Sequence, residues 1–135
     1  MKVDTLTKKP TAALKKLLWE WFSRYIRLRD QGLCFTCSTI KDYKEMDAGH
    51  FFDASLCPPE LYFHEKNCNC QCDSCNRYKS GNKVIYAIRL ESKYGLGVIQ
   101  ELEQIKIKRK HWTRIDYAEK IVYYREKAKE LGYIC

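Results

Sequence analysis

The chain has 135 residues, 45% of them hydrophobic, and its 25 Lys and Arg against 17 Asp and Glu give a net charge of +8. This length and composition predict one globular domain over residues 1–135 and exclude a disordered or fibrous chain. No apolar run is long enough to span a membrane and the first residues lack a secretory signal, so we expect a cytoplasmic protein whose charge favours a polyanionic partner: DNA, RNA or an acidic protein.

Residues 11–31 form the first predicted element. They place apolar side chains mostly at three- and four-residue spacing, with basic side chains mostly on the remaining surface. This pattern predicts a helix that packs one face on the core. Thr11 can cap its start, and Gly32 can end it.

The middle of the chain has a different pattern. Residues 33–70 lack a helical period and are rich in turn formers, which predicts a metal-binding turn and a loop at Pro58 and Pro59. Two short strands are expected, near 45–52 and 61–66.

A helical pattern returns from Asp73 onward. Gly95 and Gly132 stand at two of the expected helix ends. The predicted helices cover about 73–94, 97–109 and 114–131.

Four of the eight cysteines form two C-x2-C pairs with 34 residues between them. A cytosolic protein keeps its thiols reduced, so metal binding explains these cysteines better than disulfides do. Two such pairs are the usual way to build a tetrahedral zinc site, because each presents two sulfurs on one side of a tight turn. The predicted zinc ligands are Cys34, Cys37, Cys72 and Cys75.

The remaining cysteines offer alternatives. Cys68 and Cys70 could compete for the metal, but their spacing suits an extended strand whose side chains alternate between two faces. Cys57 and Cys135 are interpreted as single free thiols. The competing interpretation of the whole set is a collection of buried or reactive thiols without metal.

Three polar residues around the cysteine pairs follow an order seen in a nuclease superfamily. His50 follows the first pair in MDAGHFF, Asn67 closes FHEKN, and Asn76 directly follows the last cysteine of the second pair. This H-N-N order resembles the H-N-H/N order of the ββα-metal (HNH) nucleases. Many of these enzymes place an acidic or His ligand immediately before the catalytic His, a position that Gly49 fills here.

A longer ordered set of motifs resembles the NinG (Rap) family of lambdoid phage recombination proteins. The stretches that carry it are LWEWFSRYIRLRD, a C-x2-C, MDAGHFF, FHEKN, QCDSCN and KSGN followed by VIYAIRLESKYG. They cover about residues 18 to 131. The metal-ligand plan is also similar to that of the phage endonuclease VII resolvases. Both resemblances imply cleavage of branched DNA, such as Holliday junctions or D-loops.

The candidate residues have distinct expected roles. His50 can accept a proton from water near pH 7, because the unperturbed pKa of histidine is about 6.5. Asn76 and Asp47 offer hard oxygens that suit a catalytic Mg²⁺ or Mn²⁺. The resemblance implies that Asn67 holds the His50 loop through hydrogen bonds from its side chain to the backbone, and that the cation contacts the scissile phosphate and the leaving 3′ oxygen.

Each role has a structural alternative. His50 could be a buried structural histidine, with His64 as the working histidine or a substrate contact. Asp47 and Asn67 could be turn residues, and Asn76 could simply begin a helix. Glu65 is a possible neighbour of the site or a surface residue.

Basic residues in the second half of the chain could contact DNA phosphates, and Trp112 could stack on an exposed base. A solvated charged face is the alternative. Tyr117, Tyr123 and Tyr124 recur at roughly helical spacing, which favours core or dimer contacts. The candidate DNA contacts are Lys79, Lys106, Lys108, Arg109, Lys110 and Arg114.

We therefore expect an α+β fold, with a zinc-stapled ββα-metal core over 33–82 and flanking helices over 11–31 and 83–132. The expected function is a metal-dependent endonuclease that cleaves branched DNA. A resolvase makes two cuts, so a homodimer is possible. Two alternatives remain: an HNH nuclease without junction preference, and a non-catalytic zinc module that binds DNA or a recombination partner.

Overall fold

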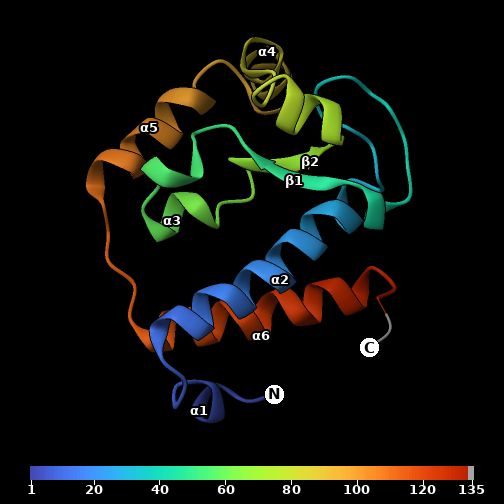
Figure 1. Cartoon of the computed structure of the whole chain (residues 1–135). Helices are drawn as coiled ribbons and strands as arrows, with labels where there is room; N and C mark the ends of the chain where they lie inside the picture. The colour runs from blue at the N-terminus through green and yellow to red at the C-terminus, as the bar shows by residue number, and fades with distance from the viewer. Residues whose placement is uncertain (134–135) are drawn as a thin grey trace.

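The computed structural model describes residues 1–133, and the predicted free thiol of Cys135 lies outside them. Two long helices, α2 (Thr11–Arg29) and α6 (Arg114–Glu130), lie along each other beneath a small hairpin (Figure 1). The helices α4 (Lys83–Tyr94) and α5 (Val98–Lys108) lie on the other side of the hairpin. The fold is mixed α and β, as predicted.

Helix α2 forms because its apolar residues repeat every fourth position. Leu14, Leu18, Phe22 and Ile26 are fully buried, and they pack with residues of α6 in the largest core cluster. The predicted helix is confirmed, but Thr11 is its first residue and Pro10 precedes it as N-cap without a side-chain bond. A proline fits here, because the first helical N–H groups have no partner within the helix.

The sheet has two antiparallel strands, β1 (Asp47–His50) and β2 (Cys68–Gln71). His50 pairs with Cys68 and Asp47 with Gln71. The first predicted strand is confirmed at its centre. The extended strand that the spacing of Cys68 and Cys70 favoured is present as β2, and all four of its residues are buried, so neither face is open to solvent.

The second predicted strand, near 61–66, is wrong. The short helix α3 (Pro59–Tyr62) occupies part of this segment, and His64 follows it in a turn. The cause is Pro59 at the first helical position, where its fixed φ favours a helical start. The strand begins only at Cys68.

The predicted helix over 73–94 is interrupted. One π-helical turn, η3 (Ser74–Tyr78), is followed by Ser80, Gly81 and Asn82, all with positive φ, before α4 begins. Gly81 donates its amide to the carbonyl of Cys75, which closes the turn. The KSGN stretch therefore acts as a break rather than as helix interior.

The remaining helices differ in length and in how their ends are formed. At the start of α6, Thr113 and Asp116 exchange the bonds of a capping box, and α5 ends at Arg109 in the left-handed region. The short ones are α1 (Val3–Leu6), η1 (Tyr43–Glu45) and η2 (Ala54–Leu56). Among residues 1–133 no helix combines the length and apolarity needed to cross a membrane.

Candidate metal and catalytic site

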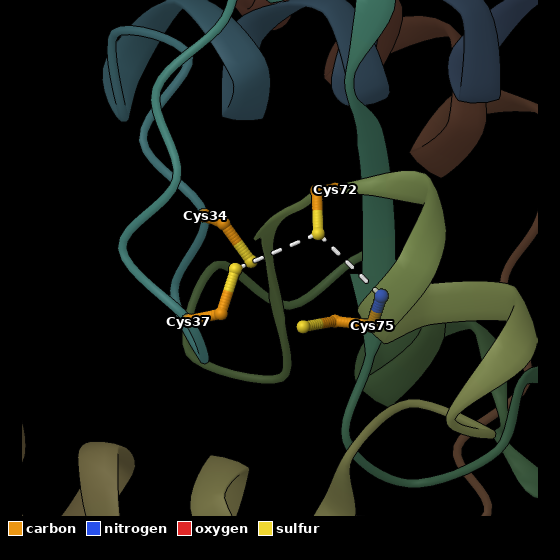
Figure 2. Close-up of side chains that lie close together, drawn as sticks. All are labelled: Cys34, Cys37, Cys72 and Cys75. Atoms are coloured by element: carbon orange, nitrogen blue, oxygen red, sulfur yellow. Dashed lines mark hydrogen bonds between the residues drawn. The ribbon is translucent and has the colours of Figure 1, made fainter.

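Four cysteines converge between the first turn-rich loop and the segment after β2. The sulfurs of Cys34, Cys37, Cys72 and Cys75 all lie within 4.8 Å of one another. In Figure 2 the pairs come from two separate segments and point toward a common centre. The Sγ atoms of Cys37 and Cys72 are 3.6 Å apart, close to the ~3.8 Å that tetrahedral zinc with Zn–S bonds of about 2.3 Å requires. The predicted cluster is confirmed as a set of ligands that can hold a zinc ion.

Burial and hydrogen bonds act differently on the four sulfurs of the cluster. The backbone N–H of Cys75 donates to Cys72 Sγ (3.5 Å), and Asn82 Nδ2 donates to Cys75 Sγ (3.8 Å). Burial alone would raise the pKa of Cys34, but bonds from Thr36 and from backbone amides lower this pKa to about 6. Burial raises the pKa of Cys72 to about 12. A bound cation would offset the repulsion between four thiolates in so small a volume.

Cys68 and Cys70 do not join this cluster. Cys68, the first residue of β2, is fully buried in the core cluster that includes residues of α2 and α6, and burial raises its pKa well above the usual range. Cys70 packs behind the cluster next to Met46, and burial raises its pKa to about 12. Cys57 is half-buried and donates to the carbonyl of Phe52 (3.3 Å). Each of these three is a free thiol with a protonated sulfur at neutral pH.

The cluster holds Asn76 in place. Asn76 directly follows Cys75 in η3, and its backbone N–H donates to the carbonyl of Cys72 (3.0 Å). Asn76 therefore lies one peptide bond from Cys75 of the cluster, within the same turn. It is not in the first turn of a long helix, because η3 ends before α4 begins.

His50 is the last residue of β1, and its ring is held between aromatic side chains. Trp19 stacks on the ring at 5.3 Å between centroids, and Tyr62 lies on it at 4.6 Å. Nε2 donates to the carbonyl of Tyr62 (2.8 Å), because a carbonyl can only accept. This bond leaves the lone pair on Nδ1. Burial lowers the pKa of His50 below its usual 6.5, so the ring is neutral at pH 7.

Asn67 fixes the chain that follows His50. Its Oδ1 accepts from the backbone N–H of Phe52 (2.9 Å), and its Nδ2 donates to the carbonyl of Leu61 (3.1 Å). Its own carbonyl accepts from the N–H of Phe51 (2.8 Å). The side-chain to backbone bonds expected from the resemblance are present, and the residue is fully buried.

Asp47 meets Asn76 through an oriented hydrogen bond. Asn76 Nδ2 donates to Asp47 Oδ2 (3.1 Å), and Arg77 Nε lies 3.3 Å from the same oxygen. The two predicted cation ligands are thus adjacent. It is the NH2 group of Asn76 that faces Asp47, however, and its oxygen faces elsewhere.

His50 and Asn76 line the same cavity of about 300 Å³. Lys83, at the start of α4, also lines it, and its ammonium donates to the carbonyls of His50 (2.6 Å) and Phe51 and pairs with Asp53 (3.2 Å). A second cavity of about 330 Å³, beside Asp47, is also lined by Asn76 together with Arg27 and Arg77. Asn76 therefore borders both.

Sequence reasoning missed Lys83, Arg27 and Arg77. Their only signal was position: Lys83 directly follows the KSGN turn and Arg77 directly follows Asn76. Arg27 gave no signal beyond the basic face of the first helix. The chain has many basic residues, and only the fold shows that these three line the cavities beside His50, Asn76 and Asp47.

Other predicted residues lie away from this cavity. The Nδ1 of His64 accepts from the N–H of Lys66 (3.1 Å), and His64 lines a different cavity. Glu65 accepts from the phenols of Tyr25 (3.1 Å) and Tyr124 (3.2 Å), which makes it an internal contact of the core. His64 and Glu65 thus lie outside the cavity that His50 shares with Asn76.

Most of the aromatic residues in and just before α6 lie in the core. Trp112 is buried and stacks on Phe63, so it is not available to stack on a base, contrary to that expectation. Tyr117 and Tyr124 are core residues, as favoured, while Tyr123 is exposed.

The predicted DNA contacts lie in two places. Lys79 is exposed directly after η3, and Lys106 extends over the ring of Phe52 at 5.4 Å. Both are close in the chain or in space to segments that border the His50 cavity. The others are exposed on the end of α5, the connection to α6 and the start of α6 (Figure 1): Lys108, Arg109, Lys110 and Arg114.

Comparison with known proteins gives a consistent picture. The family described as Bacteriophage Lambda NinG protein matches residues 1–133. Proteins named Protein ninG from Salmonella phage P22 and Escherichia phage lambda are each 33% identical to this chain over 132 residues, which is 97% of the chain and 64% and 63% of those proteins. The chain thus spans just under two thirds of the length of these relatives. No solved structure matches the chain.

Proposed function

We propose, from the premise that this chain belongs to the NinG family of bacteriophage proteins, that it is a metal-dependent endonuclease of the HNH type. The single observation that carries the proposal is that His50 and Asn76 line one cavity beside a cluster of four cysteines. The hairpin β1–β2 and the following η3–α4 segment would be the ββα-metal core. The zinc-stapled turn would set the position of Asn76.

His50 would be the general base. Its Nε2–H is engaged by Tyr62, so Nδ1 would take the proton from a water molecule as the water oxygen attacks the scissile phosphorus. The P–O3′ bond would then break, the leaving 3′ oxygen would take a proton from solvent water, and the imidazole would become an imidazolium that returns its proton to solvent. Two aromatic rings hold the imidazole in one orientation, which reduces the reorganisation needed for attack.

A bound Mg²⁺ or Mn²⁺ would neutralise charge on the phosphate and on the leaving 3′ oxygen. The residues present fit such a cation, because amide and carboxylate oxygens are its preferred protein ligands. Asn76 supplies an amide oxygen at the cavity, and Asp47 lies beside it.

Asn67 and Lys83 would position His50 without reacting. Asn67 fixes the backbone of Phe52, and Lys83 bonds to the carbonyl of His50 itself. Together they hold the end of β1 and the following turn from two sides. The zinc site would act in the same way on Asn76, as a structural element that needs no contact with the substrate.

DNA is the proposed substrate, and branched recombination intermediates are the proposed class. The net charge of +8 and the exposed lysines and arginines support binding of a phosphate backbone. The preference for branched DNA rests on the resemblance alone, as does a homodimer that would place two cuts.

Substrate choice can be tested by competition between two substrates of equal length. A four-way junction and a linear duplex would be offered in Mg²⁺, each labelled, at the same concentration. We expect cleavage of the junction at arms near the crossover, with little cleavage of the duplex. Equal cleavage of both would indicate an HNH nuclease without junction preference, and binding without cleavage would indicate a zinc-stabilised DNA-binding module.

A further inference from the structure

One buried side-chain polar atom in residues 1–133 has no hydrogen-bond partner. It is Oε1 of Gln71, the last residue of β2, and the whole residue is fully buried. Buried polar groups in folded proteins are nearly always paired, because an unpaired one loses its bonds to water without replacement. The oxygen of Gln71 is therefore free to accept a bond from a group that does not belong to the protein chain.

The orientation of the Gln71 amide is fixed by its nitrogen. Nε2 donates to the carbonyl oxygen of Gly81 (2.9 Å) and to Thr36 Oγ1 (3.2 Å). A carbonyl cannot donate, so exchanging the amide oxygen and nitrogen would bring two acceptors together. The free oxygen of Gln71 thus points away from Gly81.

The orientation of the Asn76 amide is fixed in the same manner. Its Nδ2 donates to the carboxylate of Asp47, which can only accept, so its Oδ1 is turned away from Asp47. Both amides therefore have their NH2 groups bound to acceptors and their oxygens free to accept.

The two free oxygens meet beside Gly49. A Cβ at Gly49 would lie 1.9 Å from Gln71 Oε1 and 2.8 Å from Asn76 Oδ1. Both oxygens thus lie against Gly49, in room that exists because residue 49 has no side chain. Their short distances to one shared point bring the two oxygens within reach of a single Mg²⁺, which binds oxygen at about 2.1 Å.

We infer that Gln71 is a ligand of the catalytic divalent cation, sharing it with Asn76, and that Asp47 positions Asn76 instead of binding the cation directly. This inference rests on the proposed function and refines its cation site. The acceptor that orients Asn76 is a carboxylate already paired with Arg77, which reduces its capacity as a metal ligand. Two neutral amides would leave the full charge of the cation available to phosphate.

The test is direct binding of Mn²⁺ to the zinc-loaded full chain, followed by electron paramagnetic resonance of free Mn²⁺. We expect Gln71→Ala and Asn76→Ala each to weaken binding about tenfold or more. Asn69→Ala is the matched control, because it removes another buried amide of β2 that bonds Arg29 and Tyr86. Asn69→Ala and Asp47→Asn, which keeps an acceptor for Asn76, should change the affinity by less than about threefold.

Two substitutions at Gly49 make the test independent of the bonds lost in Gln71→Ala. Gly49→Ala leaves the amide of Gln71 in the chain but places a carbon 1.9 Å from its oxygen and 2.8 Å from Asn76 Oδ1, so these oxygens must shift and Mn²⁺ binding should also weaken. Gly49→Asp in the Gln71→Ala background puts a carboxylate in the vacated space and should restore binding. Zinc content and the melting temperature of each preparation identify the folded variants.

The outcomes separate the inference from the proposed function. If Asn76→Ala weakens Mn²⁺ binding while folded Gln71→Ala or Gly49→Ala binds as the wild type does, Gln71 is not a ligand and the proposed function still stands. If Asp47→Asn weakens binding as much as Asn76→Ala does, the assignment of Asp47 as a positioning residue is overturned. If the wild type binds no Mn²⁺ at all, both the inference and the proposed cation site are wrong.

Discussion

Cys75 and Asn76 are consecutive residues that serve two different sites. The sulfur of Cys75 belongs to the four-cysteine cluster, whereas the side chain of Asn76 lines the cavity that also contains His50. The backbone between them is held by bonds from Cys75 N–H to Cys72 Sγ and from Asn76 N–H to the Cys72 carbonyl. Loss of a metal from the cluster should therefore change the position of Asn76 at the cavity.

The first prediction concerns zinc. Metal analysis should give about one zinc per chain, and Cys72→Ser should lose that zinc and much of its stability, because a structural zinc site contributes folding energy directly. Thermal melting and elemental analysis of the same preparations are the measurements. Cys57→Ser is the matched control, since Cys57 lies outside the cluster and its thiol donates to carbonyl oxygens and accepts a long bond from Asn67 Nδ2 (3.7 Å), which a serine hydroxyl can also do. Full zinc retention and normal melting in Cys34→Ser or Cys72→Ser would overturn the site.

The second prediction concerns Asn67. Asn67→Ala leaves the buried N–H of Phe52 and the carbonyl of Leu61 without their partners, so it should lower the free energy of unfolding by about 1–3 kcal/mol per unpaired group. Urea unfolding of the wild type and of Asn67→Ala measures this difference in the free energy of unfolding. Asn67→Asp keeps an acceptor for Phe52 and should restore part of the loss. An unchanged midpoint in Asn67→Ala would show that these bonds do not hold the loop.

The third prediction concerns pH. Burial lowers the pKa of His50 from 6.5, so in the folded protein the imidazole deprotonates at a lower pH than in the unfolded chain. The rate of cleavage should rise with pH and level off below pH 6.5, because only the neutral ring can accept a proton. Between the lowered pKa and 6.5 the unfolded chain binds more protons, so His50 makes stability fall as pH falls through this window.

The measurements for this prediction are a pH profile of the cleavage rate at saturating Mg²⁺ and the proton titration of His50 by NMR. A midpoint above 6.5 in both would show that a negative group, and not burial, governs the ring. Trp19→Ala is an informative companion variant. It opens the stacked face of the ring to water, so the midpoint should move upward toward the usual value.

The sequence predicted the elements that depend on local pattern. The C-x2-C spacing identified the cysteine cluster, and the four-residue repeat through Leu14, Leu18, Phe22 and Ile26 identified α2. The helix and each cysteine pair depend on neighbours in the chain, and the meeting of the two pairs follows from the four ligands that a structural zinc site needs.

The features that the sequence did not predict depend on tertiary contacts. Strand β2 is buried on both faces, so it shows no alternation of apolar and polar side chains, and only the spacing of Cys68 and Cys70 indicated an extended strand there. Gln71 appears in the sequence as an ordinary polar residue before a cysteine. Only the approach of Asn76 and the missing side chain of Gly49 give its oxygen a distinct environment. Lys83 likewise becomes recognisable only through its bonds to the carbonyls of His50 and Phe51.

The most direct test of the proposed function is cleavage of a four-way DNA junction by the wild type and by His50→Ala, with and without Mg²⁺. Zinc content, melting temperature and junction binding of each protein are measured alongside. We predict Mg²⁺-dependent cleavage by the wild type and a loss of about 10²- to 10⁴-fold in His50→Ala, with binding and zinc largely unchanged, because a general base contributes to the reaction more than to affinity. Cleavage by His50→Ala at the wild-type rate, or no cleavage by the wild type in Mg²⁺, would contradict the proposal.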